Sequence, residues 1–354
     1  MSLAEGHRGV TQKKGRYGTA MIDNLCIVVP VYDDWASLNV LLSRLNAVAK
    51  SIESRIFVTV VDDGSIAKID GSIEDLSALT SLQGIEIVHL AVNVGHQRAI
   101  AIGMCVAVEE DKRDAVLVMD GDGEDPPESI PILLAQAEGR SEFCIVAQRR
   151  RRHETIGFRL SYLLYKSLFR LLTGTEINFG NFSLTSSGYV RRLVMISELW
   201  NNLAAAILRS RLPVVKVPID RGWRYAGNSK MNFVSLIVHG LSGISVYADA
   251  IFVRMLLLTI FLVSFAGVTI ATVLFLRIFH PQYATPGWAT TVSFGMIIIL
   301  MQVFFTTISS ILMLLNNRVQ RLVLPILEYR PYIASRRLIA GRRVAAEPDK
   351  PAAG

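Results

Sequence analysis

Two long apolar runs near the carboxyl end constrain the fold of this chain most strongly. Residues 251–276 and 289–315 are almost entirely apolar, and a helix that crosses a bilayer needs about 20 such residues. Neither run contains an Asp, Glu or Lys away from its ends, which argues against a transport pathway through them. We predict a transmembrane hairpin over residues 249–316, preceded by an interfacial helix over 233–248 that leads directly into it.

The distribution of positive charge predicts how this hairpin is oriented. The chain has a formal net charge of +7, and basic residues lie near the apolar runs rather than along an extended nucleic-acid-binding face. Seven arginines follow the second run: Arg318, Arg321, Arg330, Arg336, Arg337, Arg342 and Arg343. The loop between the runs carries only Arg277 and His280. By the positive-inside rule, both ends of the hairpin are cytoplasmic, including a basic tail over 317–354.

The preceding part of the chain alternates between two hydrophobic patterns. Short apolar runs predict buried strands at residues 25–31, 56–61, 86–90, 115–119 and 142–147, and helical patterns lie at 35–51, 72–82, 97–109 and 127–137. Such alternation is typical of an α/β domain with a mostly parallel sheet covered on both faces. We expect this domain to occupy residues 23–232, after a flexible leader over 1–22. The three cysteines lie among apolar residues and lack the spacing of metal ligands. We therefore predict that they are reduced thiols in the core.

A basic amphipathic segment follows the last predicted strand. Residues 156–173 mix leucine and phenylalanine with arginine and lysine, and four arginines at 149–152 come just before them. A helix of this kind can lie on an anionic membrane surface. The alternative is that it packs on the sheet.

The predicted strand at 115–119 runs straight into clustered carboxylates. Asp120 and Asp122 are separated by one glycine, so the backbone can turn and direct both side chains toward one point. Oxygen ligands at this density suit Mg²⁺ or Mn²⁺ bound to a phosphate. The alternative interpretation is an acidic turn after a buried strand.

Three other predicted strands also end in polar or glycine-rich residues. These ends are Tyr32-Asp33-Asp34, Asp62-Asp63-Gly64-Ser65 and Asn93-Val94-Gly95-His96. Consecutive parallel strands place their carboxyl ends along one edge of the sheet, where ligands bind in open α/β sheets. The four ends together predict a site for a polar, phosphorylated ligand.

The order of these motifs resembles that of the family 2 inverting nucleotide-sugar glycosyltransferases. The motifs are Val29-Pro30-Val31-Tyr32, Val61-Asp62-Asp63-Gly64-Ser65, Asn93-x-Gly95 and Asp120-x-Asp122-x-x-Asp125-Pro126-Pro127-Glu128. The later stretch from Arg221 to Lys230 resembles the R-x-x-R-x-x-G-x-S-K element of the polyprenyl-phosphate branch, whose bacterial members often end in two spanning helices. The resemblance implies a Rossmann-like domain of the GT-A type. It also implies a multi-pass protein of the bacterial inner membrane with its catalytic domain and both termini in the cytoplasm.

The resemblance also implies roles for individual residues. The nucleotide-sugar positions are Pro30, Tyr32, Asp34, Asp62, Asp63, Asn93, Gly95, Arg221 and Ser229. The metal positions are Asp120, Asp122 and Glu124, and the catalytic positions are Asp122, Arg224 and Lys230. Family members commonly have Glu where this chain has Asp34, and many have Gln where it has Glu124. The basic residues among them would face the donor pyrophosphate or the acceptor phosphate.

One loop departs from the family pattern. Many relatives have G-D-F-R-L in the acceptor loop, whereas this chain has Gly180-Asn181-Phe182-Ser183-Leu184. Both charges are lost, so the acceptor phosphate must find its cation elsewhere. Arg191, Arg192 and the arginines at 149–152 are the candidates.

The implied reaction is transfer of one sugar from a nucleotide sugar to a polyprenyl phosphate, with inversion. A UDP-sugar is favoured over a GDP-sugar, and Mg²⁺ or Mn²⁺ is the expected cofactor. A phosphate monoester is largely ionised near neutral pH, because its second pKa is about 6, so it needs no strong general base. If a base assists, Asp122 is the nearest acidic candidate. Hairpin helices with few polar residues could pack into a homodimer or homotetramer.

Two other functions compete with this one. A processive polysaccharide synthase of the same fold would usually carry a Q-x-x-R-W element and more spanning helices, and the sequence has neither. A non-catalytic membrane scaffold of a glycosylation or flippase complex could have lost its metal carboxylates, whereas this chain keeps Asp120, Asp122 and Lys230.

Overall fold

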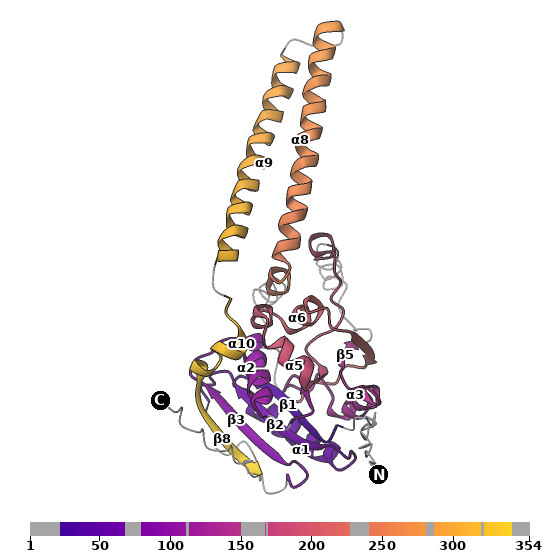
Figure 1. The fold of residues 1–354 in the computed structure, drawn as a ribbon, viewed down its shortest axis with the longest axis vertical. Helices are drawn as coiled ribbons and strands as arrows, with labels where there is room; N and C mark the ends of the chain where they lie inside the picture. The colour runs from indigo at the N-terminus through magenta and orange to yellow at the C-terminus, as the bar shows by residue number, and fades with distance from the viewer. Residues whose placement is uncertain are drawn as a thin grey trace, which may run out of the picture.

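The computed structural model describes most of the chain. The described residues are 22–67, 79–110, 113–149, 167, 169–226, 241–280, 287–319 and 322–341. The predicted leader therefore lies almost wholly outside them, as does most of the predicted amphipathic helix at 156–173. In Figure 1 a globular part built on one sheet carries two long helices that extend away from it side by side.

Within the described residues, eight strands form one sheet in the order β7-β5-β6-β4-β1-β2-β3-β8. The strands are β1 (Asn24–Val31), β2 (Arg55–Asp62), β3 (Gly84–Leu90), β4 (Ala115–Val118), β5 (Cys144–Arg149), β6 (Ser183–Ser186), β7 (Val214–Ile219) and β8 (Ile333–Gly341). The central strands β4, β1, β2 and β3 are parallel to one another. β6 and β8 are antiparallel to their neighbours. The predicted α/β class with a mostly parallel sheet is confirmed.

Helices cover both faces of this sheet because its strands alternate between two apolar clusters. Helices α1 (Trp35–Ala49) and α3 (Ile130–Ala137) pack with the side chains of Leu25, Ile27 and Val29 on one face. Helices α2 (His96–Glu109), α5 (Ser187–Leu193) and α6 (Leu203–Arg209) pack with Cys26 and Val28 on the other. The three cysteines are free and buried within these layers, as the sequence predicts. Short helical turns complete the domain: η2 (Pro127–Ser129), η3 (Ser197–Trp200), α10 (Pro325–Glu328) and η5 (Arg330–Tyr332).

One predicted helix is wrong over the part that the structure describes. The pattern at 72–82 predicts a helix, but residues 79–82 form a turn, and residues 68–78 lie outside the described residues. Leu79 and Leu82 are buried in the core. Their apolar spacing therefore reflects a packed turn before β3 rather than the face of a helix.

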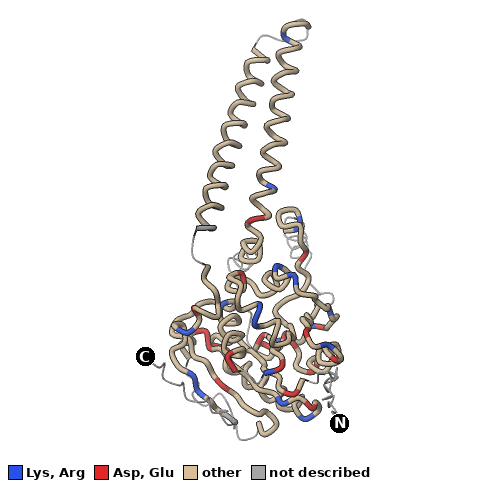
Figure 2. The backbone as a smooth tube through the Cα atoms, viewed as in Figure 1, with Lys and Arg blue, Asp and Glu red and all other residues tan. Residues whose placement is uncertain are grey.

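The two apolar runs are helices α8 (Ala248–Phe279) and α9 (Trp288–Val319). Both are long and apolar enough to cross a membrane, with mean hydropathies of 2.4 and 2.3. Their most apolar windows are only 11% and 0% buried within the protein, so these are not core helices of a soluble fold. Figure 2 shows that the middle of each helix carries no charged residue. Both helices are therefore candidate membrane spans, and their apolar side chains are largely exposed on the surface of the protein.

The segment after α9 returns to the sheet, which the sequence does not predict. Residues 317–354 are expected to be a basic tail, but Ile333–Gly341 pair with β3 as the edge strand β8. Arg336 donates two hydrogen bonds to the carboxylate of Glu86 on β3, at 2.9 and 2.7 Å. Arg336, one of the arginines of the predicted basic tail, is therefore part of an ion pair between two strands.

Candidate active site

The polar ends of the four central strands lie together, as the parallel order predicts. The carboxylate of Asp63, after β2, accepts hydrogen bonds from the backbone N–H groups of Val94 and Gly95, after β3, at 2.7 and 3.0 Å. The ring of His96 lies 3.1 Å from the carboxylate of Asp120, after β4. The register of the parallel strands explains this arrangement, because Val31 at the end of β1 lies opposite Asp62 and Asp62 lies opposite His89 near the end of β3.

The loop after β4 is held in a tight turn by hydrogen bonds from its backbone N–H groups to its own carboxylates. The backbone N–H of Asp120 donates to Asp125, and the N–H of Glu124 donates to Asp122, each at 3.0 Å. Gly123 between them has a φ of +95°, which side chains with a Cβ rarely adopt. The loop therefore holds the acidic side chains of Asp120, Asp122 and Glu124 at one strand end.

A second segment, far along the chain, is bonded to this loop backbone to backbone. The N–H of Gly222 donates to the carbonyl of Glu124, and the N–H of Tyr225 donates to the carbonyl of Asp122, both at 2.9 Å. A Cβ added at Gly123 would lie 2.7 Å from the carbonyl oxygen of Trp223, and one at Gly222 would lie 2.2 Å from that of Gly123. Glycines at 123 and 222 therefore permit this close approach. We call residues 122–124 and 222–225 the paired loops.

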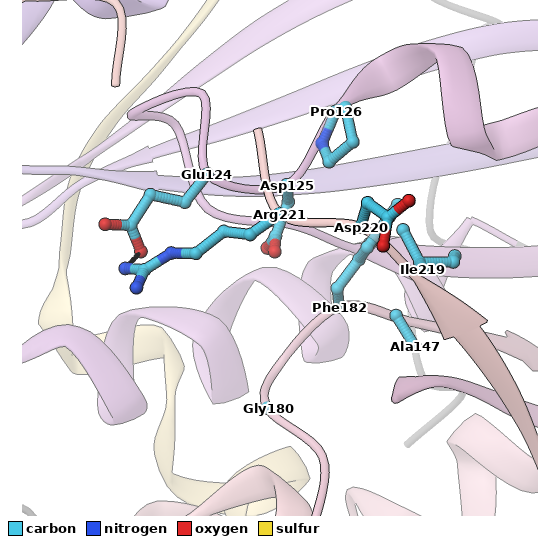
Figure 3. A pocket seen from close by; sticks show the side chains of 9 residues that line it. All are labelled: Glu124, Asp125, Pro126, Ala147, Gly180, Phe182, Ile219, Asp220 and Arg221. Carbon is cyan, nitrogen blue, oxygen red and sulfur yellow. Dashed lines mark ion pairs between the residues drawn. The ribbon is translucent and has the colours of Figure 1, made fainter. Parts of the chain in front are cut away.

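Pairing of the loops puts two arginines next to predicted metal carboxylates: Arg224 within the second loop and Arg221 directly before it. Arg224 lies 3.0 Å from Asp122 and 3.4 Å from Asp34, so it connects the ends of β4 and β1. Arg221 forms an ion pair with Glu124, which Figure 3 shows from close by. Guanidinium groups that can leave a carboxylate for a diphosphate are suited to a site that binds and releases one. The structure thus brings together five of the residues that the resemblance assigns: Asp34, Asp122, Glu124, Arg221 and Arg224.

Asp122 lies in a partly buried, strongly charged environment. Burial raises its pKa, and the charges of Asp120 and Glu124 raise it further, whereas the backbone hydrogen bond from Glu124 and the charge of Arg224 lower it. The net shift is upward. A bound cation would oppose this shift, because it stabilises the ionised carboxylate.

The predicted nucleotide positions fall into two groups. Pro30 and Tyr32 lie at the end of β1, and the side chain of Tyr32 is exposed. Asp62 is buried instead, and it accepts hydrogen bonds from the N–H of Ser65 at 2.9 Å and shares one with His89 at 2.8 Å. Asp63 is also buried, with both carboxylate oxygens engaged by backbone N–H groups, and burial raises its pKa. Direct contact of Asp62 and Asp63 with a nucleotide stays a prediction.

Asn93 and Gly95 lie in the turn between β3 and α2. Asn93 is exposed, and Gly95 precedes the first residue of α2 with a φ of +92°. The backbone N–H of Gly95 donates to Asp63, so this turn is held against the end of β2. Its contact with a donor stays a prediction.

The acceptor loop contributes a residue whose neighbours the sequence did not reveal. Asn181 donates from its side-chain amide to Asp120 at 3.5 Å, and the same amide nitrogen lies 3.1 Å from the ring nitrogen Nε2 of His96. Buried Gln97 donates to Asn181 at 3.1 Å and accepts from the backbone N–H of Leu203 at 2.8 Å. The loop without its usual charges is therefore held inside the site by neutral hydrogen bonds. The pairing of Asn181 with Asp120 has no local sequence signal beyond its departure from the family pattern.

His96 is a cationic candidate next to Asp120, with its ring nitrogen Nε2 3.1 Å from the carboxylate. Partial desolvation lowers the pKa of its ring, but the charge and hydrogen bond of Asp120, together with Asp63 and Asp122, raise it by more. The side chain keeps 45% of its surface exposed. A ligand at the strand ends can therefore reach it.

A small hollow lies beside the paired loops, over the ends of β5 and β7. It encloses about 250 Å³, including space open to solvent. Its apolar floor includes Ala147, Phe182 and Ile219, and charged residues Asp125, Asp220 and Arg221 surround it (Figure 3). The hollow places hydrogen-bonding carboxylates next to the Arg221–Glu124 ion pair.

The carboxylate set suits a cation that is shared with a substrate. Among the residues that the structure describes, no three His, Cys, Asp or Glu side chains form a ready metal cage. Mg²⁺ is commonly held by one or two carboxylates together with substrate phosphates and water. Asp120 and Asp122 fit that pattern, whereas Glu124 faces Arg221. Lys230 and Ser229, and the arginines at 150–152, lie outside the described residues.

Comparison with known proteins identifies the class of this domain. Residues 26–195 match the family model described as Glycosyl transferase family 2. This part of the chain is therefore a family 2 glycosyltransferase domain, which confirms the resemblance seen in its motifs.

Curated relatives extend the similarity beyond the family model. The chain is 30% identical over 220 residues to undecaprenyl-phosphate 4-deoxy-4-formamido-L-arabinose transferase from Shewanella sediminis, covering 61% of this chain and 64% of that protein. It is 28% identical over 219 residues to the enzyme of the same name from Aeromonas hydrophila, covering 60% and 64%. The chain thus spans less than two thirds of the length of these relatives.

Among solved structures, the chain is similar to mannosyl-3-phosphoglycerate synthase from Rubrobacter xylanophilus. The TM-score is 0.46, with 17% identity over 64% of this chain and 73% of that one. This similarity is too weak to support a conclusion about ligands.

Proposed function

We propose that this protein transfers one sugar from a nucleotide sugar to a polyprenyl phosphate at the cytoplasmic face of a bacterial inner membrane. The observation that carries the proposal is the position of Arg224 between Asp122 and Asp34 in a chain that also has two helices long and apolar enough to span a membrane. The paired charges suit a diphosphate, and the two helices support a site that works next to a membrane. The names of the curated relatives support the same acceptor class.

In this proposal the site residues bind and orient rather than exchange protons. Asp120 and Asp122 would hold a divalent ion, and such an ion would supply Lewis-acid neutralisation of charge on the leaving diphosphate. Arg221 and Arg224 exchange their carboxylate partners for donor phosphate oxygens, and Lys230 and Ser229 join them. Positioning and electrostatics supply most of the acceleration, since the acceptor phosphate is already ionised. We favour uracil as the base, with inversion at the anomeric carbon.

The acceptor phosphate lies close to Asn181 in this scheme. The amide of Asn181 is a neutral donor, and His96 lies beside it, so the loop can contribute hydrogen bonds where relatives place charge. Cations for the phosphate come from neighbouring segments, with Arg191, Arg192 and the arginines at 149–152 as candidates. The catalytic domain and both termini are cytoplasmic, as the arginines after α9 indicate.

A panel of labelled nucleotide sugars with undecaprenyl phosphate tests the proposal. The panel includes UDP- and GDP-hexoses and nucleotide-linked 4-deoxy-4-formamido-L-arabinose, each with Mg²⁺ or Mn²⁺, and the product is scored by extraction into organic solvent. We expect one donor to give a lipid-linked product that disappears when EDTA removes the metal. Absence of lipid-linked product with every donor would reject the proposal.

A further inference from the structure

Helix α8 carries one charged residue beyond its first turn and within its apolar sequence, close to the end that joins the catalytic domain. This residue is Arg254, between Asp249 in the first turn and Arg277 in the last turn. A charged side chain within a membrane helix is costly unless it reaches water or finds partners in the protein. Arginines near the ends of such helices commonly extend to the headgroups.

Arg254 has protein partners instead. Its guanidinium Nη1 donates to the backbone carbonyls of Leu171 and, at 3.3 Å, Arg170. These carbonyls belong to the last turn of the helical residues 169–173. Carbonyls at the end of a helix, such as that of Leu171, often lack a backbone partner, and a cation there also interacts favourably with the helix dipole. Arg254 therefore caps one helix from another.

The chain leaves room for this guanidinium by placing a glycine at the helix end. Gly174 has a φ of +74°, and its N–H donates to the carbonyl of Arg170 at 2.8 Å. A Cβ added at Gly174 would lie 2.1 Å from Nη2 of Arg254. The guanidinium of Arg254 thus lies against the helix end at Gly174, although the side chain as a whole is exposed.

Two further contacts join the start of α8 to the catalytic domain. The rings of Phe169 and Tyr247 meet edge to face with centroids 6.0 Å apart, within a buried cluster. Arg209 on α6 pairs with Asp249 at 2.8 Å. The first turns of α8 are therefore held by both α6 and the segment at 169–174.

That segment leads to the candidate active site, because only residues 175–180 separate Gly174 from Asn181. A displacement of about 1 Å between reacting groups can lower a rate by about 100-fold. An acceptor anchored in the bilayer has its height set by the membrane. The enzyme must therefore fix the height of its own site relative to α8.

We propose that Arg254 is a positioning residue that fixes the catalytic domain relative to the membrane helix, so that a bilayer-anchored polyprenyl phosphate meets the donor. The inference rests on the proposed function. Arg254 does not contact the substrates in this proposal. It acts through the carbonyls of Arg170 and Leu171.

Two acceptors separate this role from a general effect on folding. Transfer is measured to undecaprenyl phosphate in liposomes and to citronellyl phosphate, a short acceptor that reaches the site from water. We expect Arg254→Gln to lower kcat/KM for the long acceptor about tenfold or more. Donor affinity and transfer to the short acceptor should stay within about twofold of wild type. Arg254→Lys keeps the charge but loses the planar guanidinium, so its kcat/KM for the long acceptor should lie between those of wild type and Arg254→Gln.

The matched control is Arg277→Gln, at the opposite end of the same helix, which should leave both transfers unchanged. Equal losses on both acceptors after Arg254→Gln would overturn the proposal, because they indicate a general structural defect. Unchanged transfer to both acceptors would overturn it too.

A distance measurement tests the same role without catalysis. Spin labels are placed on the exposed positions Met195 in the catalytic domain and Leu274 in α8, and the three native cysteines are buried. We expect Arg254→Gln, but not Arg277→Gln, to broaden the distance distribution in liposomes, and an unchanged distribution would contradict the proposal. If the wild-type protein transfers sugar to neither acceptor, the proposed function fails while this measurement still judges the role of Arg254.

Discussion

The guanidinium of Arg224 lies 3.0 Å from the carboxylate of Asp122 while its other terminal nitrogen lies 3.4 Å from Asp34. One side chain thus connects the ends of two neighbouring strands across a sequence separation of more than a hundred residues. Because both carboxylates are partly buried, Arg224 offsets charges that would otherwise repel each other. Binding of a metal and a diphosphate would supply new partners to all three groups at once.

Replacement of this arginine should weaken donor binding. Arg224→Gln removes a charged, forked donor, and such hydrogen bonds contribute about 1.5–3 kcal/mol, so donor affinity should fall by about 10- to 100-fold. Arg224→Lys should recover part of the loss. Calorimetric titration with the nucleotide sugar in the presence of Mn²⁺ measures the effect. Unchanged affinity in Arg224→Gln would remove this residue from the donor site.

Loss of a strand-end carboxylate should abolish transfer without unfolding the protein. Asp122→Ala should lower the rate by about 100-fold or more, because a bound divalent ion supplies several kcal/mol of charge stabilisation. Expression and membrane insertion should be normal. Glu138→Gln, an exposed carboxylate at the end of α3, is the control. Full activity of Asp122→Ala in EDTA would reject the metal assignment.

The raised pKa of Asp122 predicts how stability responds to pH. A carboxyl with a higher pKa in the folded state than in the unfolded state holds its proton longer when folded. Its contribution therefore makes the ligand-free protein more stable as pH falls from above the folded pKa toward the unfolded value. Urea unfolding of wild type and Asp122→Asn across mildly acidic pH checks the sign. A wild-type curve that falls more steeply than that of the variant as pH decreases would contradict it.

The contact between the paired loops should make Gly123 intolerant of any side chain. Gly123→Ala adds both an unfavourable φ and a Cβ 2.7 Å from the carbonyl oxygen of Trp223. Gly139→Ala is a matched control, because Gly139 has a φ of +73° but a Cβ there meets no described atom within 4 Å. Gly139→Ala should lower the free energy of unfolding by about 1–2 kcal/mol. Gly123→Ala should lower it by more and should also weaken donor binding. Thermal unfolding and donor titration measure both, and equal effects of the two variants would contradict the close approach.

The bridge made by Gln97 should be needed for a correctly placed acceptor loop. Gln97→Leu keeps the side-chain volume but leaves the N–H of Leu203 without its partner, at a cost of about 1–3 kcal/mol. It also releases Asn181, so transfer should fall more than donor affinity does. Gln97→Glu keeps the acceptor for Leu203 and should preserve more stability. A Gln97→Leu protein with wild-type unfolding and transfer would exclude this role.

The central sheet could be predicted from the sequence because its strands carry their own signal. β1 and β4 are nearly continuous apolar runs, β2 and β3 are mostly apolar, and all four are followed by polar ends, so the sequence predicted these strands and their shared edge. β6 is different: Ser183–Ser186 is short and largely polar, and it becomes a strand because β4 and β5 lie on either side of it. β8 likewise contains two arginines, and its partner Glu86 lies more than two hundred residues away.

The candidate site shows the same division. The resemblance to a known family assigned Asp120, Asp122 and Arg224 to one site, and the structure adds the direct contact of Arg224 with Asp122. The sequence could not predict that Arg221 would pair with Glu124 or that Gln97 would hold Asn181. The contact of Arg221 with Glu124 depends on backbone pairing between distant loops, and that of Gln97 with Asn181 joins two side chains from distant segments; neither leaves a periodic pattern in the sequence. Gly123 and Gly222 are the sequence feature that this loop pairing requires, because a Cβ at either position would clash with the other loop. The structure was needed to show that the two glycines face each other's loop.

The return of the chain to the sheet at β8 has a consequence for how the protein is made. Of the eight strands in the described part of the chain, seven are synthesised before the hairpin and β8 after it, so β3 gains its outer neighbour only after both apolar helices have left the ribosome. Until then β3 is an open edge. Biogenesis therefore ends with β3 being covered, and a nascent chain arrested in the second membrane segment would expose an edge on which other chains can aggregate.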